Sequence, residues 1–345
     1  MITRKRAWSV VKWVATFALV ALVFRRVPLR DLGARLGSIA LGDWILLTVL
    51  VTLQVAISVV RWWRLLRAVG ERIPYLAVFG DLTVGILYNM LLPTSVGGDV
   101  VRAIRMRART REAHHAWSTS IFERLAGLLA MGLGGATAAA YGLHGDSRLP
   151  PSVGIATLAA SLAFLAFFSL ASVPFRIASR AIGKRLPAAA SRDVDGIAAD
   201  LAGPLAKPAV RIEVLGWSLA YQGVAMVFVI AGARALGANG HETAILVGMP
   251  LVYVLGMIPV TIGGHGLREG LYVFVLGTLG MPEGAALGLA ALWLISSLAF
   301  AVSGLTVLLL GPSPTRTTGS IPQAQFGRAA VKPDVPPARG GRARD

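Results

Sequence analysis

Long apolar segments dominate this chain and leave it few folds other than a helical membrane protein. The chain is 55% hydrophobic and only 15% charged, with a mean hydropathy of +0.67. That composition is too apolar for a soluble domain of this length. A helix needs about 20 residues to cross a bilayer, and each apolar segment is close to that length. We therefore predict an all-α polytopic membrane protein whose full spans are residues 8–24, 42–66, 117–141, 151–174, 212–236 and 284–310.

Two further apolar segments, 75–96 and 243–280, contain the same short motif. Residues 88–102 read YNMLLPTSVGGDVVR and residues 257–270 read MIPVTIGGHGLREG, so both follow the pattern P-x3-G-G-x3-R. Hydrophobic segments interrupted by Gly and Pro at matching places in two halves indicate the substrate site of a repeat-built transporter. The matching residues are Pro93 with Pro259, Gly97 with Gly263, Gly98 with Gly264 and Arg102 with Arg268.

The distribution of basic residues predicts how these segments are threaded. The formal net charge is +17, and arginines flank both ends of segment 75–96. Because basic loops stay in the cytoplasm, this segment enters and returns on one side as a re-entrant hairpin. Segment 243–280 then forms a second hairpin from the outside. We expect about six full spans plus two re-entrant hairpins related as an inverted repeat, with both termini cytoplasmic.

Three connecting regions complete this topology. Residues 175–211 form a basic cytoplasmic loop, and residues 312–345, rich in Pro, Gly and Arg, form a disordered basic cytoplasmic tail. The transmembrane domain is thus residues 1–311. The first loop fits poorly, because the topology places its arginines outside. Either it is an amphipathic surface segment or the first span is misassigned; these arginines are Arg25, Arg26, Arg30 and Arg35.

The glycine pairs and the arginines that follow them suggest an anion site. Gly97-Gly98 and Gly263-Gly264 let the chain turn and leave backbone N–H groups free at the start of a short helix. Arginine grips phosphate through two parallel hydrogen bonds, so Arg102 and Arg268 make a phosphate the expected ligand. The alternative is that these glycines only allow close helix packing.

Several ionisable residues lie in apolar surroundings, where they are costly and indicate a site or pathway. Function is favoured for Asp99, Arg102, Arg268 and Glu269. For the adjacent Glu123 and Arg124 a binding role and a structural ion-pair network are equally open. Neighbours in a helix point about 100° apart, so each is expected to pair with another segment. Asp81 and Arg234 are interpreted as structural or interfacial.

Other features exclude or weaken further functions. The chain has no cysteine, which excludes disulfides and thiol chemistry. The basic residues are spread over many loops, which argues against nucleic-acid binding. No Walker A sequence is present, no cofactor is expected, and His265 with Glu269 is too small a group to predict a metal. His114-His115 is interpreted as a solvated surface, and residues 61–64 (RWWR) as an interfacial belt.

These motifs resemble a known family. N-x2-L-P-x3-G-G-D-x2-R from Asn89 to Arg102, the pair Glu123-Arg124, and P-x3-G-G-x-G-x-R-E from Pro259 to Glu269 are similar to the lysylphosphatidylglycerol synthase transmembrane domain, also described as a flippase-like domain. The resemblance covers roughly residues 8–310. It implies translocation of an aminoacylated phosphatidylglycerol that a separate soluble domain makes. With only a short tail here, we expect a stand-alone domain without aminoacyl transfer.

The expected function is therefore that of a membrane lipid translocase in the bacterial cytoplasmic membrane, and not of an enzyme. Its cargo would be an anionic, aminoacylated or isoprenoid-linked phospholipid. The alternatives are a non-transporting accessory protein with an envelope-synthesis partner, and a membrane-embedded lipid-modifying transferase. The oligomeric state is left open. The candidate substrate-binding residues are Asn89, Pro93, Gly97, Gly98, Asp99, Arg102, Glu123, Arg124, Pro259, Gly263, Gly264, Arg268 and Glu269.

Overall fold

The computed structural model describes a protein whose assigned elements are all helical. It describes residues 29–92, 97–145, 187–256, 261 and 264–311, with scattered positions between 152 and 181. Within these residues there is no strand, which confirms the all-α prediction. The expected span 8–24, most of the expected span 151–174 and the tail 312–345 lie outside the described residues.

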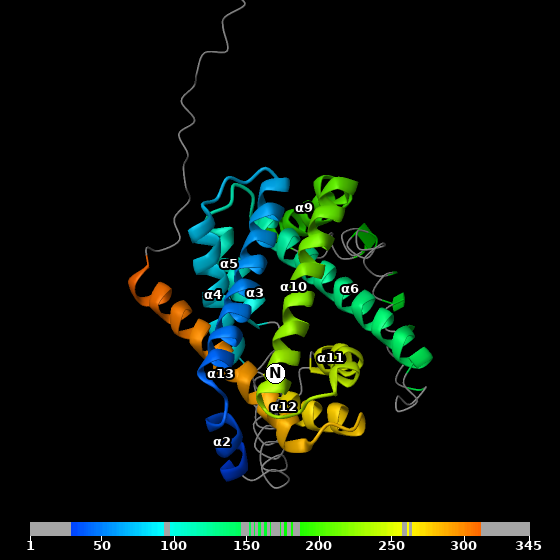
Figure 1. Cartoon of the computed structure of the whole chain (residues 1–345). Coiled ribbons are helices and arrows are strands. Elements are labelled where there is room, and N and C mark those ends of the chain that lie inside the picture. The colour runs from blue at the N-terminus through cyan, green and yellow to red at the C-terminus, as the bar shows by residue number, and fades with distance from the viewer. Residues whose placement is uncertain are drawn as a thin grey trace, which may run out of the picture.

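Three helices in the described part of the chain are long and apolar enough to cross a bilayer. These are α3 (Leu41–Ala68), α10 (Pro208–Ala235) and α13 (Glu283–Leu310), each of 28 residues. At 1.5 Å per residue each is about 42 Å long, which exceeds the roughly 30 Å hydrocarbon core. They correspond to the predicted spans 42–66, 212–236 and 284–310. The α3 and α10 helices pack side by side along the middle of the molecule (Figure 1).

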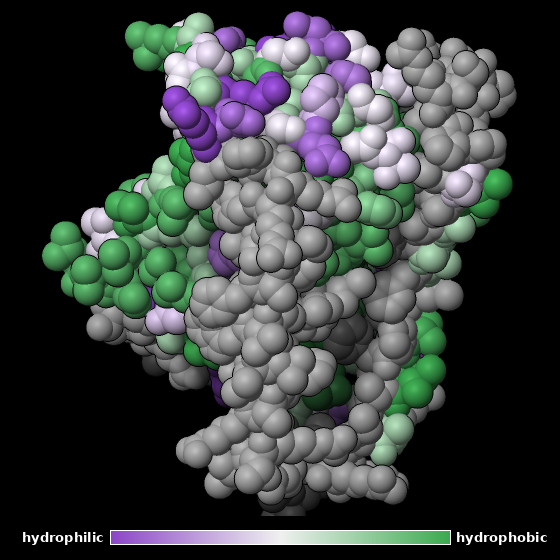
Figure 2. Space-filling model, turned by 90° about the horizontal axis from the view of Figure 1, so that it is seen from below, coloured by the Kyte–Doolittle hydropathy of each residue, from purple (hydrophilic) through white to green (hydrophobic). Residues whose placement is uncertain are grey.

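The outer surface of these helices is apolar, as lipid contact requires. Large hydrophobic side chains are exposed along all three, among them Ile45, Ile212 and Val302. Figure 2 shows broad hydrophobic areas on the described surface, with the hydrophilic residues gathered towards one edge of that face. A soluble protein rarely exposes contiguous apolar patches of this kind, so these faces are suited to a bilayer.

The first motif segment folds as a helical hairpin. Helix α4 (Tyr75–Leu91) ends before the motif, and α5 (Gly97–Arg107) runs back along it. Asp81 of α4 is completely buried, and its carboxylate accepts hydrogen bonds from Arg105 Nε at 2.8 Å and Arg109 Nε at 3.0 Å. Asp81 is therefore a structural residue, as expected, and ties the two helices together.

The second motif segment is also broken into shorter pieces. Helix α11 (Glu242–Gly256) precedes the motif, and α12 (Leu267–Leu271) contains the motif's last residue, Arg268, and continues as a π-helical turn, Tyr272–Leu276. Both following pieces contact α11. In Figure 1 the α4–α5 pair lies in the upper half of the molecule, whereas α11 and α12 lie in the lower half.

Helix α6 (Ala113–Gly145) contains the predicted span 117–141 and joins the two halves. It crosses the molecule at a tilt and contacts α5, α9, α10 and α11. Close helix contacts are allowed by glycines elsewhere as well. At Gly304 of α13, for example, an added Cβ would overlap with the Thr83 carbonyl oxygen of α4.

Two regions that were predicted to be loops contain helices in the structure. The arginines of the first loop that are described, Arg30 and Arg35, lie on a short helix, α2 (Leu29–Gly37), which packs near the start of α13. This agrees with the surface-segment alternative. The predicted basic loop 175–211 was wrong in part, since α9 (Ala188–Ala202) and a 3-10 turn (Pro204–Ala206) occupy it. Helix α9 forms because Leu201 and Ile197 are buried against α6.

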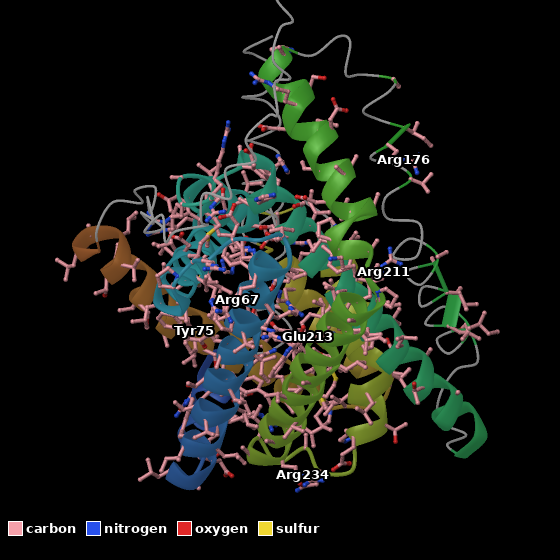
Figure 3. All side chains as sticks on the ribbon, turned by 90° about the horizontal axis from the view of Figure 1, so that it is seen from above. Arg67, Tyr75, Arg176, Arg211, Glu213 and Arg234 are labelled. Atoms are coloured by element: carbon pink, nitrogen blue, oxygen red, sulfur yellow. The ribbon has the colours of Figure 1, made fainter. Side chains whose placement is uncertain are left out.

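Charged side chains mark the two ends of α10. Figure 3 shows Arg211 and Glu213 near its start and Arg234 near its end. Glu213 pairs with Arg64 of α3, and Arg234 Nη2 pairs with Glu242 Oε1 at 2.9 Å. The interfacial reading of Arg234 agrees with this exposed position.

The contact between α4 and α5 predicts the effect of one substitution. At Gly98 an added Cβ would overlap with the Gly85 carbonyl oxygen and the Asn89 side chain. Overpacking of this kind usually costs about 1–3 kcal/mol, so Gly98→Ala is expected to lower the unfolding temperature of the purified protein in detergent. Gly134→Ala is the matched control, because an added Cβ there meets nothing. Equal stability of the two variants would contradict this packing.

Candidate functional site

A cavity of about 380 Å³ lies where the two motif segments approach each other. The first motif segment contributes Asn89, Asp99 and Arg102 to its lining, and the second segment contributes Gly256 and Arg268. Helices α3, α6 and α10 supply most of the remaining walls, and α13 supplies Trp293. The volume falls within the roughly 300–1,000 Å³ of small-molecule pockets. Residues far apart in the sequence thus line one chamber.

Glu123 of α6 is the centre of the ionic network in this cavity. Its Oε1 accepts hydrogen bonds from Arg61 Nη2 at 2.8 Å, Arg61 Nε at 3.2 Å and Ser58 Oγ at 3.3 Å. Its Oε2 lies 2.8 Å from Arg102 Nη2, in ion-pair contact but at an angle unsuited to a hydrogen bond. Glu123 is 1% exposed. One carboxylate therefore holds two guanidinium groups, from α3 and from α5.

A second carboxylate extends the network towards α6. Asp99 pairs with Arg124, and its Oδ1 lies 3.3 Å from Arg102 Nε. Among the described residues, the cavity lining thus contains four arginines, Arg61, Arg102, Arg124 and Arg268, but only two acids, Asp99 and Glu123. Two positive charges are in excess. An excess charge in a low-dielectric site is costly, so the cavity favours an anion.

The two motif arginines share a further feature, because each lies over a tryptophan. Arg102 Cζ is 4.7 Å from the ring centroid of Trp62, and Arg268 Cζ is 3.6 Å from that of Trp293. These distances are those of cation–π contacts, which hold a guanidinium in place without neutralising its charge. Arg268 has no carboxylate ion-pair partner among the described residues, since the Glu269 carboxylate bonds to the Gly266 N–H at 2.6 Å instead.

The three motif glycines that are described, Gly97, Gly98 and Gly264, serve the backbone rather than the cavity. Gly97 and Gly98 are buried at the start of α5, and the Gly98 N–H donates to Asn89 Oδ1 at 2.8 Å. Gly264 has φ +78°, a left-handed conformation that favours glycine. Glu269 closes the turn that precedes α12. Gly98 therefore fits the close-packing alternative. Its backbone N–H, which the anion-site hypothesis assigned to a ligand, donates to Asn89 instead.

The predicted site residues thus separate into three groups. Those that line the cavity are Asn89, Asp99, Arg102, Glu123, Arg124 and Arg268. Those that shape the adjoining backbone are Gly97, Gly98, Gly264 and Glu269. Pro93, Pro259 and Gly263 lie outside the described residues. As expected, the adjacent Glu123 and Arg124 each pair outside α6, Glu123 with Arg61 of α3 and Arg102 of α5, and Arg124 with Asp99 of α5.

Sequence reasoning missed Arg61. Residues 61–64 (RWWR) were interpreted as an interfacial belt, but Arg61 is 7% exposed and Trp62 is completely buried. Trp63, the second tryptophan of this group, is partly buried and lies against Arg67 and Tyr75, which are labelled in Figure 3. The available signal was the set of polar residues inside apolar spans that line the cavity beside Arg61, namely Gln54, Ser58, Tyr221 and Gln222.

A second cavity, of about 250 Å³, adjoins the first. Both are lined by Gln54, Asn89, Tyr221, Arg268 and Trp293. The second cavity adds Ser296, Ser297, His265 and several apolar side chains, including Phe228 and Phe300. Arg268 therefore lies at the junction of two chambers, and among the described lining residues it is the one arginine that the second chamber shares with the strongly charged first chamber.

The Glu123 network predicts a large loss of stability. Glu123→Gln keeps the side-chain shape but removes the carboxylate from Arg61 and leaves Arg102 with Asp99 alone. Removing one partner of a buried ion pair costs about 3–5 kcal/mol, which denaturant unfolding in detergent would measure. Glu213→Gln removes the partner of Arg64 at a partly exposed pair, where about 0–1 kcal/mol is expected. If both variants lose the same small amount, Glu123 does not organise the site.

Comparison with known proteins agrees with the resemblance seen in the motifs. The family model described as the lysylphosphatidylglycerol synthase TM region matches residues 9–304. A search of curated proteins finds no match. The family match includes both motifs, Glu123-Arg124 and nearly the whole described fold. The chain belongs to the lysylphosphatidylglycerol synthase transmembrane-region family.

Proposed function

We propose that this chain is a flippase-like lipid translocase that binds the phosphate of a membrane lipid in the central cavity. The observation that carries the proposal is the excess of two positive charges on a cavity lined by both motif arginines. A phosphate would neutralise this excess. Because arginine binds phosphate through planar, paired hydrogen bonds, the chemistry of the lining matches a lipid headgroup better than a neutral solute.

Arg268 is the residue best suited to contact the headgroup. The Asp99 and Glu123 carboxylates are engaged with Arg61, Arg102 and Arg124. Arg268 instead lies on Trp293 at the junction of the two cavities. Its charge is thus available to a ligand. The other three arginines are each already paired with a carboxylate, so a ligand would have to share them with Asp99 or Glu123.

The broken helices support translocation rather than simple lipid binding. Non-helical backbone at membrane depth is tolerated where it lines a cavity, and transporters place substrate between broken helices of two inverted halves. We infer that the α4–α5 hairpin enters from the cytoplasm and that α11 and α12 enter from the opposite face. Movement of the two halves would expose the headgroup to each side in turn while the acyl chains stay in lipid.

The proposed cargo is an anionic, aminoacylated or isoprenoid-linked phospholipid, which share a phosphate. The proposed setting is the bacterial cytoplasmic membrane, with both termini in the cytoplasm. No chemical step is assigned to the site, because Asp99 and Glu123 are held by arginines and neither is free as a general base.

Proteoliposomes containing fluorescent phosphatidylglycerol or phosphatidylcholine would test the proposal. The wild type is expected to move the anionic lipid faster. Arg268→Gln removes a charge-assisted contact of about 1.5–3 kcal/mol, so the rate should fall about 10-fold to 100-fold. Arg234→Gln is the matched control, because Arg234 is exposed and lies outside the cavity.

Two outcomes would contradict the proposal. If the folded wild type moves no phospholipid of any headgroup charge, the chain is not a translocase of this class and the accessory role gains support. If Arg234→Gln slows movement as much as Arg268→Gln, the cavity does not select the headgroup.

A further inference from the structure

A cluster of metal-ligating side chains lies outside the cavity and has no part in the proposed function. His114 and His115 of α6 and Asp200 of α9 place their ligand atoms within 4.8 Å of one another. We propose that this cluster binds a divalent transition-metal ion of the Zn²⁺ type, with water completing its coordination. The expectation of a metal-free chain, and of His114-His115 as a solvated surface, gives way to this proposal.

The distances within the cluster suit a shared ion better than direct pairing. His114 Nε2 lies 3.8 Å from Asp200 Oδ2, and His115 Nε2 lies 3.8 Å from Asp200 Oδ1. Both distances are too long for hydrogen bonds. In a tetrahedral site with bonds of about 2.1 Å, two ligand atoms are about 3.4 Å apart. A small inward movement of the side chains would therefore complete a site with two imidazoles and one carboxylate.

The neighbouring residues orient these ligands. Glu71 Oε1 lies 2.7 Å from His115 Nδ1, which leaves Nε2 of the same ring directed towards Asp200. A carboxylate on the second nitrogen of a metal-binding histidine is a recurrent arrangement that fixes ring orientation. Ser118 Oγ donates to Asp200 Oδ2 at 2.6 Å and orients the carboxylate. Glu71 also accepts the Arg111 N–H at 2.8 Å, so its own position is fixed.

The packing of α9 holds the cluster together before an ion binds. At Gly196 of α9 an added Cβ would overlap with the His114 ring, so α9 lies directly on that side chain. Asp200 is 6% exposed, whereas both histidines are only partly buried, which leaves an entry path. Mixed nitrogen and oxygen ligands of this kind suit Zn²⁺ and related ions.

The bound ion would connect parts of the chain that meet near the ionic network. It would join α9 to the first turn of α6, and Glu71 would link the site to the connection between α3 and α4. The same α6 carries Glu123 little more than two turns further on. The ion is thus placed to fix α9 on the helix that organises the cavity.

Metal analysis of the full chain, purified in detergent, would test this proposal. Protein stripped with chelator and titrated with Zn²⁺ alone is expected to take up one ion per chain. Co²⁺ in its place should give the visible absorption of a nitrogen- and oxygen-ligated site. Hydrogen exchange of the wild type should slow in α9 on metal addition, a readout that needs no variant.

Variants locate the site. His114→Gln combined with Asp200→Asn should abolish stoichiometric uptake, and Glu71→Gln, a positioning change, should weaken affinity about 10-fold to 100-fold. His241→Gln is the control, because His241 lies at the turn before α11. Helix content of the metal-free variants, compared with metal-free wild type, shows whether they fold.

Three results would overturn the proposal. In the first, the wild type does not take up one Zn²⁺ ion per chain. In the second, the folded double variant takes up as much Zn²⁺ as the wild type. In the third, hydrogen exchange in α9 does not change when metal is added. None of them depends on lipid movement, so failure here is distinct from failure of the translocase proposal.

Discussion

The fold depends on the cost of burying Glu123. A carboxylate in apolar surroundings needs partners, and here they come from α3 and α5, as Arg61 and Arg102. These ion pairs hold α3, the α4–α5 hairpin and α6 together at Glu123. Arg61 also donates to Ser218 Oγ of α10 at 3.1 Å, so the same network reaches a fourth helix. The site and the packing of the helices are consequently one arrangement.

That network carries more positive than negative charge. Two acids cannot neutralise four arginines, and the arginine left without a carboxylate among the described residues, Arg268, comes from the other half of the chain. An apolar protein interior does not keep such an excess for stability, because hydrophobic residues of similar size would serve as well or better. This excess is the observation that supports the proposed binding of an anionic lipid headgroup in the cavity.

Much of this could be predicted from the sequence, since apolar length and basic loops are local signals. The long helices, the broken motif segments and six cavity residues were predicted in this way. Arg61 was not, because its neighbours in RWWR resemble an interfacial belt and its partner Glu123 lies 62 residues away. Helix α9 was missed for a similar reason: its burial against α6 is a tertiary contact, and its own sequence is rich in small and charged residues.

We propose that the two motif segments reach one cavity from opposite faces of the membrane. The chain has no cysteine, so single cysteines can be labelled in sealed vesicles of known orientation with an impermeant maleimide. Arg72→Cys and Arg111→Cys, which bracket the first hairpin, are predicted to react only from the cytoplasmic side. Asn239→Cys and Pro282→Cys, which bracket the second, should react only from the opposite side. Labelling of all four from the same side would rule out opposed entry of the two hairpins.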